Sequence, residues 1–175
     1  MSVELKKEKR PIWFLDYRKS GGLACDLAIH SLDILEWITG KHFYEVLSYQ
    51  EKVGNFTEKY LVNILNMILK FKEGGSAVIE ADRILPEGLG SDYRLHIVGT
   101  EGQIDMTLTG SVYLETKNIV KEIQEIPENF SVVGNWLNSF ERNETPCITN
   151  DDSIRASLLA IKARESAYKK IKIRI

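Results

Sequence analysis

Apolar and polar residues alternate over several short stretches of the sequence, and turn residues separate these stretches. The pattern occurs at residues 43–51, 58–71 and 76–83, with a glycine-rich turn at residues 72–75. A period of two residues is typical of strands that bury one face, and a short glycine-containing connection is typical of a hairpin. The sequence therefore predicts neighbouring antiparallel strands in this part of the chain.

The same pattern continues further along the chain. Residues 93–98 and 103–108 alternate on either side of a turn at 99–102, and residues 112–117 and 119–126 follow. Shorter alternating stretches at residues 3–10 and 172–175 predict one more strand at each end of the chain.

Three other stretches have apolar residues at helical spacing, residues 20–40, 130–142 and 150–170. In the first, apolar side chains occupy most of the circumference, which predicts a helix buried on several sides. Ser20 is its expected N-cap, Gly21 and Gly22 permit a sharp entry, and Gly40 is its expected end. In the third, the expected core-facing residues are Ile154, Leu158, Ile161, Ala163 and Ala167.

The order of these elements favours an α+β fold. We predict a single domain, residues 1–175, with a largely antiparallel, open β-sheet and helices packed on one face. If helices cover only one face, the apolar residues of the other face need a second cover. We therefore predict a homodimer or tetramer formed through the open sheet face.

Composition excludes several classes of protein. Hydrophobic residues make up 43% of the 175 residues and charged residues 27%, as in ordinary globular proteins. A net charge of -2 gives no positive electrostatic field that would attract nucleic acid. No apolar stretch is long enough to cross a membrane. Cys25 and Cys147 lack zinc-type spacing, and we interpret them as reduced thiols of a cytoplasmic protein.

Candidate chemistry is concentrated in the first predicted helix. Asp26, His30, Asp33 and Trp37 fall on one narrow face if the helix has 3.6 residues per turn. A carboxylate four residues before an imidazole can orient it and raise its basicity for proton transfer. Two alternatives stay open: a buried histidine whose hydrogen bond to Asp26 is purely structural, or a divalent metal bound by Asp26, His30 and Asp33.

The segment from Gly21 to Asp33 resembles the GG-x3-D-x3-H-x2-D motif of the glucose-fructose oxidoreductase and inositol dehydrogenase family, Gfo/Idh/MocA. The turn at residues 99–102 is similar to the family's G-T-x-G turn, and the last helix carries similar small residues at Ala163, Ser166 and Ala167. The resemblance covers nearly the whole chain. It implies the C-terminal domain of such an oxidoreductase, whose open sheet forms dimers and tetramers.

The resemblance also implies roles for single residues. His30 would transfer a proton to or from the substrate, Asp26 would orient His30 and contact the substrate, and Trp13 and Tyr17 would line the pocket. Hydride would pass between a sugar or cyclic polyol and NAD or NADP. No residue of this sequence is assigned to cofactor or metal binding.

The family's N-terminal Rossmann domain has no counterpart in this sequence. It contains no G-x-G-x-x-G after a strand and no segment for the family's catalytic lysine. We therefore expect the chain to be inactive and free of cofactor by itself, and to need a separate Rossmann domain. The alternative is a stand-alone, non-catalytic sugar-binding or assembly protein that retains the fold.

Overall fold

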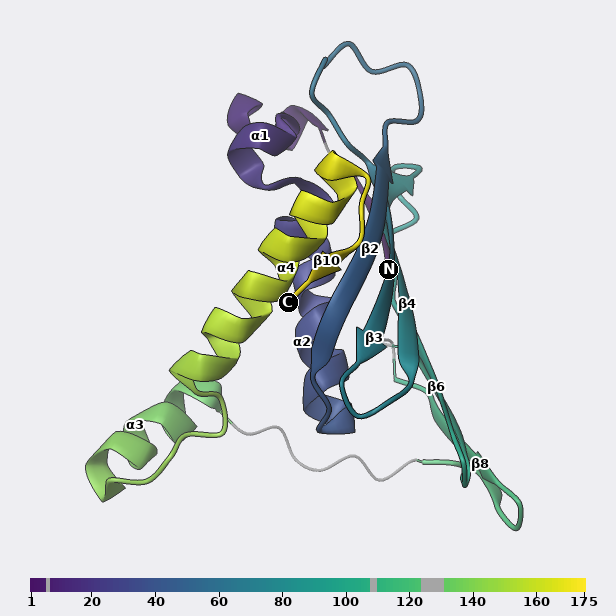
Figure 1. Cartoon of the computed structure of the whole chain (residues 1–175), viewed down its shortest axis with the longest axis vertical. Helices are drawn as coiled ribbons and strands as arrows, with labels where there is room; N and C mark the ends of the chain where they lie inside the picture. Colours follow the sequence, from purple (N-terminus) through teal and green to yellow (C-terminus); the bar gives the residue numbers. More distant parts are fainter. Residues whose placement is uncertain (6, 108–109, 124–130) are drawn as a thin grey trace. The chain divides into compact units, whose positions relative to one another are not determined.

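A computed structural model of the chain describes residues 1–5, 7–107, 110–123 and 131–175. The described residues divide into two units (Figure 1). The first contains Met1–Ser91 and Asn150–Ile175, and the second contains Asp92–Thr149. The candidate site lies entirely in the first unit, which is described first.

A six-stranded sheet with the order β10-β2-β3-β4-β1-β5 forms the first unit. Its strands are β1 (Ser2–Glu4), β2 (Phe43–Glu51), β3 (Ile64–Phe71), β4 (Ser76–Leu85), β5 (Ser91–Asp92) and β10 (Ile173–Arg174). The pairings among β10, β2, β3 and β4 are antiparallel, whereas β1 runs parallel to β4. The predicted α+β class with a largely antiparallel sheet is confirmed.

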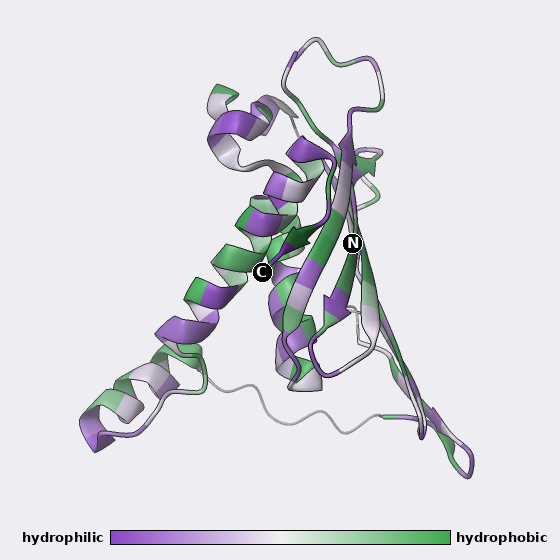
Figure 2. Cartoon of the chain, viewed as in Figure 1, coloured by the Kyte–Doolittle hydropathy of each residue, from purple (hydrophilic) through white to green (hydrophobic). Residues whose placement is uncertain are grey.

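The period-two pattern of β3 gives this sheet one buried face. Leu65, Met67, Leu69 and Phe71 are buried, and the residues between them are more exposed. Figure 2 shows hydrophobic and hydrophilic segments along β2, whose buried residues include Phe43, Val46 and Ser48. Helices α2 (Ile29–Thr39) and α4 (Asn150–Lys169) lie on one side of the sheet (Figure 1), so the helices cover the buried face and leave the other open.

Helix α4 packs through small residues, which corrects the face expected from the sequence. Its buried residues are Ala156, Leu159, Ala160, Ala163, Ser166 and Ala167. Ile154 and Ile161 are more than half exposed, at 65% and 51%. Small side chains let the helix approach β2 closely, and the Ser166 hydroxyl accepts a hydrogen bond from the Ser48 backbone N–H at 2.9 Å. Of the expected core-facing residues, Ile154, Leu158 and Ile161 therefore turn outward, whereas Ala163 and Ala167 are buried.

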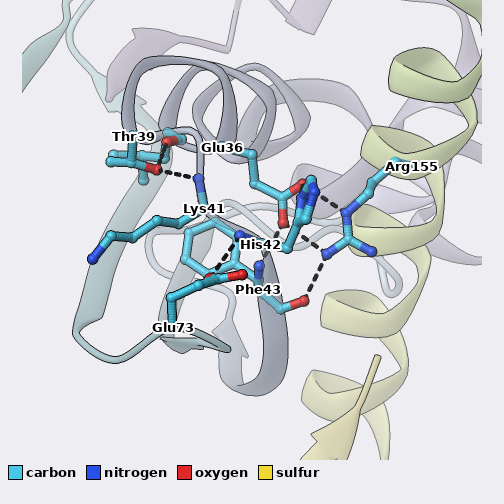
Figure 3. Close-up of polar contacts among 8 residues, drawn as sticks. Glu36, Thr39, Lys41, His42, Phe43, Glu73 and Arg155 are labelled. Carbon is cyan, nitrogen blue, oxygen red and sulfur yellow. Dashed lines mark hydrogen bonds and ion pairs between the residues drawn. The ribbon is translucent and has the colours of Figure 1, made fainter.

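A charged cluster joins α2 to α4 (Figure 3). Arg155 donates to both carboxylate oxygens of Glu36, at 2.7 and 2.8 Å, and to the backbone carbonyl of Phe43 at 2.7 Å. The Glu36 carboxylate also accepts from the Phe43 backbone N–H and contacts His42. Two-point pairing of a guanidinium with a carboxylate fixes both side chains, so this cluster sets how α2 meets α4 and β2.

The predicted N-terminal strand, residues 3–10, is shorter than expected. It comprises only β1, and a 3-10 turn, η1 (Lys7–Lys9), follows. Glu4 pairs with Leu85, the last residue of β4, so a longer β1 would run past the end of β4. Similarly, β3 begins at Ile64 instead of residue 58.

The second unit contains a four-stranded antiparallel sheet with the order β6-β7-β8-β9. Its elements are β6 (Arg94–Gly99), β7 (Gly102–Thr107), β8 (Val112–Thr116), β9 (Val120–Glu122) and helix α3 (Val132–Arg142). The strands and the helix predicted for this part of the chain are confirmed. Residue 108 and residues 124–130, where some predicted elements begin or end, lie outside the described residues.

Candidate active site

Two successive glycines with a positive φ lie near the start of the stretch from Ser20 to Gly40. Helix α1 (Tyr17–Ser20) ends at Gly21, which has a φ of +83°, and Gly22 has a φ of +67°. The predicted sharp entry at these glycines is confirmed. Ser20 is the last residue of α1 and does not directly precede the next helix, but its hydroxyl accepts from the Gly22 N–H at 3.1 Å. The other end is also as predicted, because Gly40 caps α2 with a φ of +62°.

The helix between these glycines is not uniformly α-helical. A π-helical turn, η3 (Ala24–Ala28), precedes α2. Hydrogen bonds from residue i to i+5 widen the turn, so residues on either side of it no longer follow the 3.6-residue period. Of the four residues predicted to share one narrow face, Asp26 lies in η3, whereas His30, Asp33 and Trp37 lie on α2 and are exposed.

Asp26 is paired with an arginine instead of with His30. The Asp26 carboxylate accepts a hydrogen bond from Arg83 Nη2, and the two side chains form an ion pair. Arg83 comes from the inward-facing positions of β4, and only 9% of its side chain is exposed. The His30 side chain forms no hydrogen bond or ion pair with any described residue. In this structure Asp26 therefore contacts Arg83, and the orientation of His30 by Asp26 stays a prediction.

A small, partly open pocket lies beside this ion pair. It is lined by Leu5, Phe14, Leu15, Tyr17, Ser20, Gly22, Leu23, Asp26, Leu61, Val62 and Arg83. The walls are thus mainly apolar, with a few polar groups from α1, η3 and β4. This combination is typical of small-molecule sites.

The predicted site residues separate into two groups. Tyr17 and Asp26 line the pocket. Trp13 does not; it is 54% exposed and meets the edge of Phe14, with ring centroids 6.1 Å apart. His30 is exposed on α2 outside the pocket lining. The sequence-based reasoning missed Arg83, although its position two residues after buried Ala81 places it on the inward face of β4.

The pocket wall from α1 is held by a second ion pair. Asp16 caps α1, accepts from the Arg18 backbone N–H at 3.0 Å and pairs with the Arg18 guanidinium, which stacks over the Tyr60 ring. Hydrogen bonding to Arg18 lowers the pKa of Asp16 from 3.8 to about 2. The adjacent Tyr17 N–H donates to the Tyr60 carbonyl at 3.0 Å. The ion pair therefore helps to fix Tyr17.

Replacing Asp16 with asparagine is expected to lower stability near neutral pH but not in strong acid. Because the pKa of Asp16 is lower in the folded state than in the unfolded state, its ionised form stabilises the fold above about pH 4. That contribution is lost as the pH falls to about 2. Denaturant midpoints of wild type and Asp16→Asn, measured from pH 6 to pH 2, should converge; a constant difference would contradict this explanation. Asparagine retains the N-cap.

The described residues contain no group of three or more His, Cys, Asp or Glu side chains arranged to hold a metal ion. Of the helices that the structure describes, none is long and apolar enough to span a membrane.

The sheet and the glycine-containing helix entry define an α+β domain, and comparisons with known proteins give its family. Residues 2–105 match the GFO/IDH/MocA C-terminal domain, and the chain belongs to this family. It is 29% identical to the uncharacterized oxidoreductase YrbE of Bacillus subtilis over 87% of this chain, and 24% identical to the myo-inositol 2-dehydrogenase of Thermotoga maritima over 92%.

Solved structures agree with the sequence comparisons. A Thermotoga maritima protein described as an oxidoreductase superimposes on 99% of this chain with a TM-score of 0.90 and 26% identity, covering 53% of that protein. The chain spans about half the length of the curated relatives it matches, 48% of YrbE and 52% of the myo-inositol 2-dehydrogenase. The matched half is the C-terminal domain of the family.

Proposed function

We propose that this chain is the substrate-binding and oligomerisation domain of an NAD(P)-dependent oxidoreductase that acts on a sugar or cyclic polyol. The observation that carries the proposal is the pocket beside Asp26, a residue that lies within the matched family domain. Asp26 contacts the substrate there, and Tyr17 forms part of the wall. His30 is the proton-transfer group, reaching substrate bound between this surface and a second domain.

The similarity to a myo-inositol 2-dehydrogenase supports a polyol substrate. Oxidising a secondary alcohol removes a hydride from carbon and a proton from oxygen. NAD or NADP would supply the hydride acceptor, bound by a separate Rossmann domain. This chain's own residues bind the polyol and accept the hydroxyl proton. The two free cysteines support a reducing, cytoplasmic location for the protein.

The DNA immediately upstream of codon 1 tests this proposal. We expect an in-frame or adjacent segment that encodes a Rossmann domain with a catalytic lysine. Co-expression of that domain with this chain should give a protein that reduces NAD or NADP in the presence of myo-inositol or a related polyol, whereas this chain alone should give no turnover. A promoter directly before Met1 with no Rossmann segment nearby would instead support a stand-alone binding or assembly protein. Turnover by this chain alone would contradict the expectation that it is inactive without a Rossmann domain.

The open face of the large sheet supports the oligomerisation role. Ile68 on β3 lies opposite Leu47 on β2 and Val78 on β4, forming an apolar row across three strands. Ile68 is 51% and Val78 is 68% exposed. Such a row costs free energy in water unless a second surface covers it. A second copy of the chain is our proposed cover.

Replacing Ile68 with glutamate is expected to convert a dimer or larger assembly into a monomer, because a charge would be buried in the centre of the interface. Solution mass by light scattering at matched concentrations would measure the change. Ile154→Glu is the matched control: Ile154 is also exposed but lies on α4, away from the open sheet face. A monomeric wild type, or equal effects of both variants, would contradict the proposed interface.

A further inference from the structure

Of the described residues that line the pocket, only two are charged, and they carry opposite charges. Arg83 and Asp26 form an ion pair with each other. Their formal charges cancel, so the pocket as a whole offers no net attraction to an ionic ligand. Both residues nevertheless retain hydrogen-bonding groups that the pair does not use. The Asp26 carboxylate binds Arg83 through Oδ2, which leaves Oδ1 without a hydrogen bond to any described residue.

Arg83 is held firmly but is not fully satisfied. Its backbone N–H donates to the Asn63 carbonyl at 2.9 Å, and its guanidinium lies 5.3 Å from the centroid of the Phe14 ring. Nη2 binds Asp26. Nε is buried without a hydrogen-bond partner among the described residues, and Nη1 forms no hydrogen bond with them either. A buried guanidinium normally uses most of its five donors, so Nη1, which unlike Nε is not fully buried, is the donor that a ligand in the pocket can meet.

We propose that Arg83 and Asp26 together recognise two adjacent hydroxyl groups of a neutral polyol and discriminate against sugar acids. One hydroxyl donates to Asp26 Oδ1, and the oxygen of its neighbour accepts from the Arg83 guanidinium. A ligand carboxylate would be attracted by Arg83 but repelled by the Asp26 carboxylate that already neutralises it. This inference rests on the proposed function and adds a selecting residue and a charge preference to it.

NMR of the whole chain tests the pair directly. The Nε–H signal of Arg83 in a ¹⁵N-labelled sample is assigned by its loss in Arg83→Lys. Titration with myo-inositol should shift this signal to saturation, and D-glucuronate should bind at least about tenfold more weakly. Arg83→Lys should weaken myo-inositol binding, followed on neighbouring backbone signals, because an ammonium cannot replace the guanidinium fork.

Asp26→Asn supplies the decisive comparison. Asparagine has nearly the same shape as aspartate but no charge, so the Arg83 charge is no longer neutralised. The variant should reverse the preference, binding D-glucuronate about tenfold more tightly than wild type does and myo-inositol less tightly. Arg94→Lys is the matched control, since Arg94 is an exposed, aspartate-paired arginine outside the pocket, and it should leave both affinities unchanged. Far-UV circular dichroism checks that each variant is folded.

The outcomes separate this inference from the proposed function. If wild type binds myo-inositol but Arg83→Lys and Asp26→Asn leave the ratio of the two affinities unchanged, the inference fails and the proposed function stands. If wild type binds the two ligands with equal affinity, the inference likewise fails and the proposed function stands. If neither ligand shifts any signal of the wild-type chain, both the inference and the proposed substrate-binding role are overturned.

Discussion

Replacing His30 with asparagine is expected to lower kcat by about 10²- to 10⁴-fold in the enzyme assembled from this chain and its Rossmann domain. An imidazole can hold and release a proton near neutral pH, whereas an amide cannot. His30 is exposed, and none of the residues that the structure describes occupies its ring nitrogens. A substrate bound against this surface could therefore use either nitrogen.

The rate of NADH or NADPH formation at saturating polyol measures this effect, and the Michaelis constant shows whether binding changes as well. A loss confined to kcat is expected, since His30 lies outside the pocket lining. His42→Asn is the matched control, because His42 is also exposed but its Nδ1 contacts Glu36 at 3.3 Å in the cluster that joins α2 to α4. Unchanged kcat in His30→Asn, or an equal loss in His42→Asn, would leave His30 as an ordinary surface residue.

The parts of the fold that could be predicted from the sequence are those in which the same physical requirement recurs along the chain. A strand that buries one face must alternate, and Leu65, Met67 and Leu69 on β3 do so. Gly40 marks the end of α2 because a left-handed backbone favours glycine. Such patterns are local, so they can be recognised without knowing which strands are neighbours.

The candidate site could not be predicted in full, because it depends on contacts between residues that are far apart in the sequence. The π-helical turn at Ala24–Ala28 leaves the sequence pattern looking like an ordinary helix, and within it Asp26 pairs with Arg83. Arg83 is 57 residues from Asp26 along the chain, and their pairing requires β4 to lie beneath η3. One signal was nevertheless present: Ile79, Ala81 and Arg83 share the inward phase of β4, and an inward arginine needs a partner.

Replacing Gly21 with alanine is expected to destabilise the fold by about 3 kcal/mol. Two separate costs contribute. The φ of +83° is unfavourable for any residue with a side chain, and the added Cβ would lie 2.7 Å from Cys25 Cβ and 2.8 Å from Cys25 Sγ. Cys25 is part of η3; its Sγ can rotate away about the Cα–Cβ bond, but its Cβ cannot retreat without moving that turn.

Gly40→Ala separates the two costs. Gly40 also has a positive φ, +62°, but no atom lies within 4 Å of an added Cβ. Only the backbone cost remains, and a loss of about 1 kcal/mol is expected. Denaturant unfolding at unchanged slope measures both values, and equal losses would show that Cys25 yields to the new methyl group.

The contact between Gly21 and Cys25 also connects the glycines of the family motif to the site. A methyl group at residue 21 would push Cys25 and, with it, the π-helical turn that carries Asp26. Asp26 would then move relative to Arg83, which β4 holds in place through Asn63. Gly21→Ala should therefore shift the Nε–H signal of Arg83, whereas Gly40→Ala, at the far end of α2, should leave it unchanged. An unshifted Arg83 signal in a folded Gly21→Ala protein would mean that the glycine serves only the backbone turn.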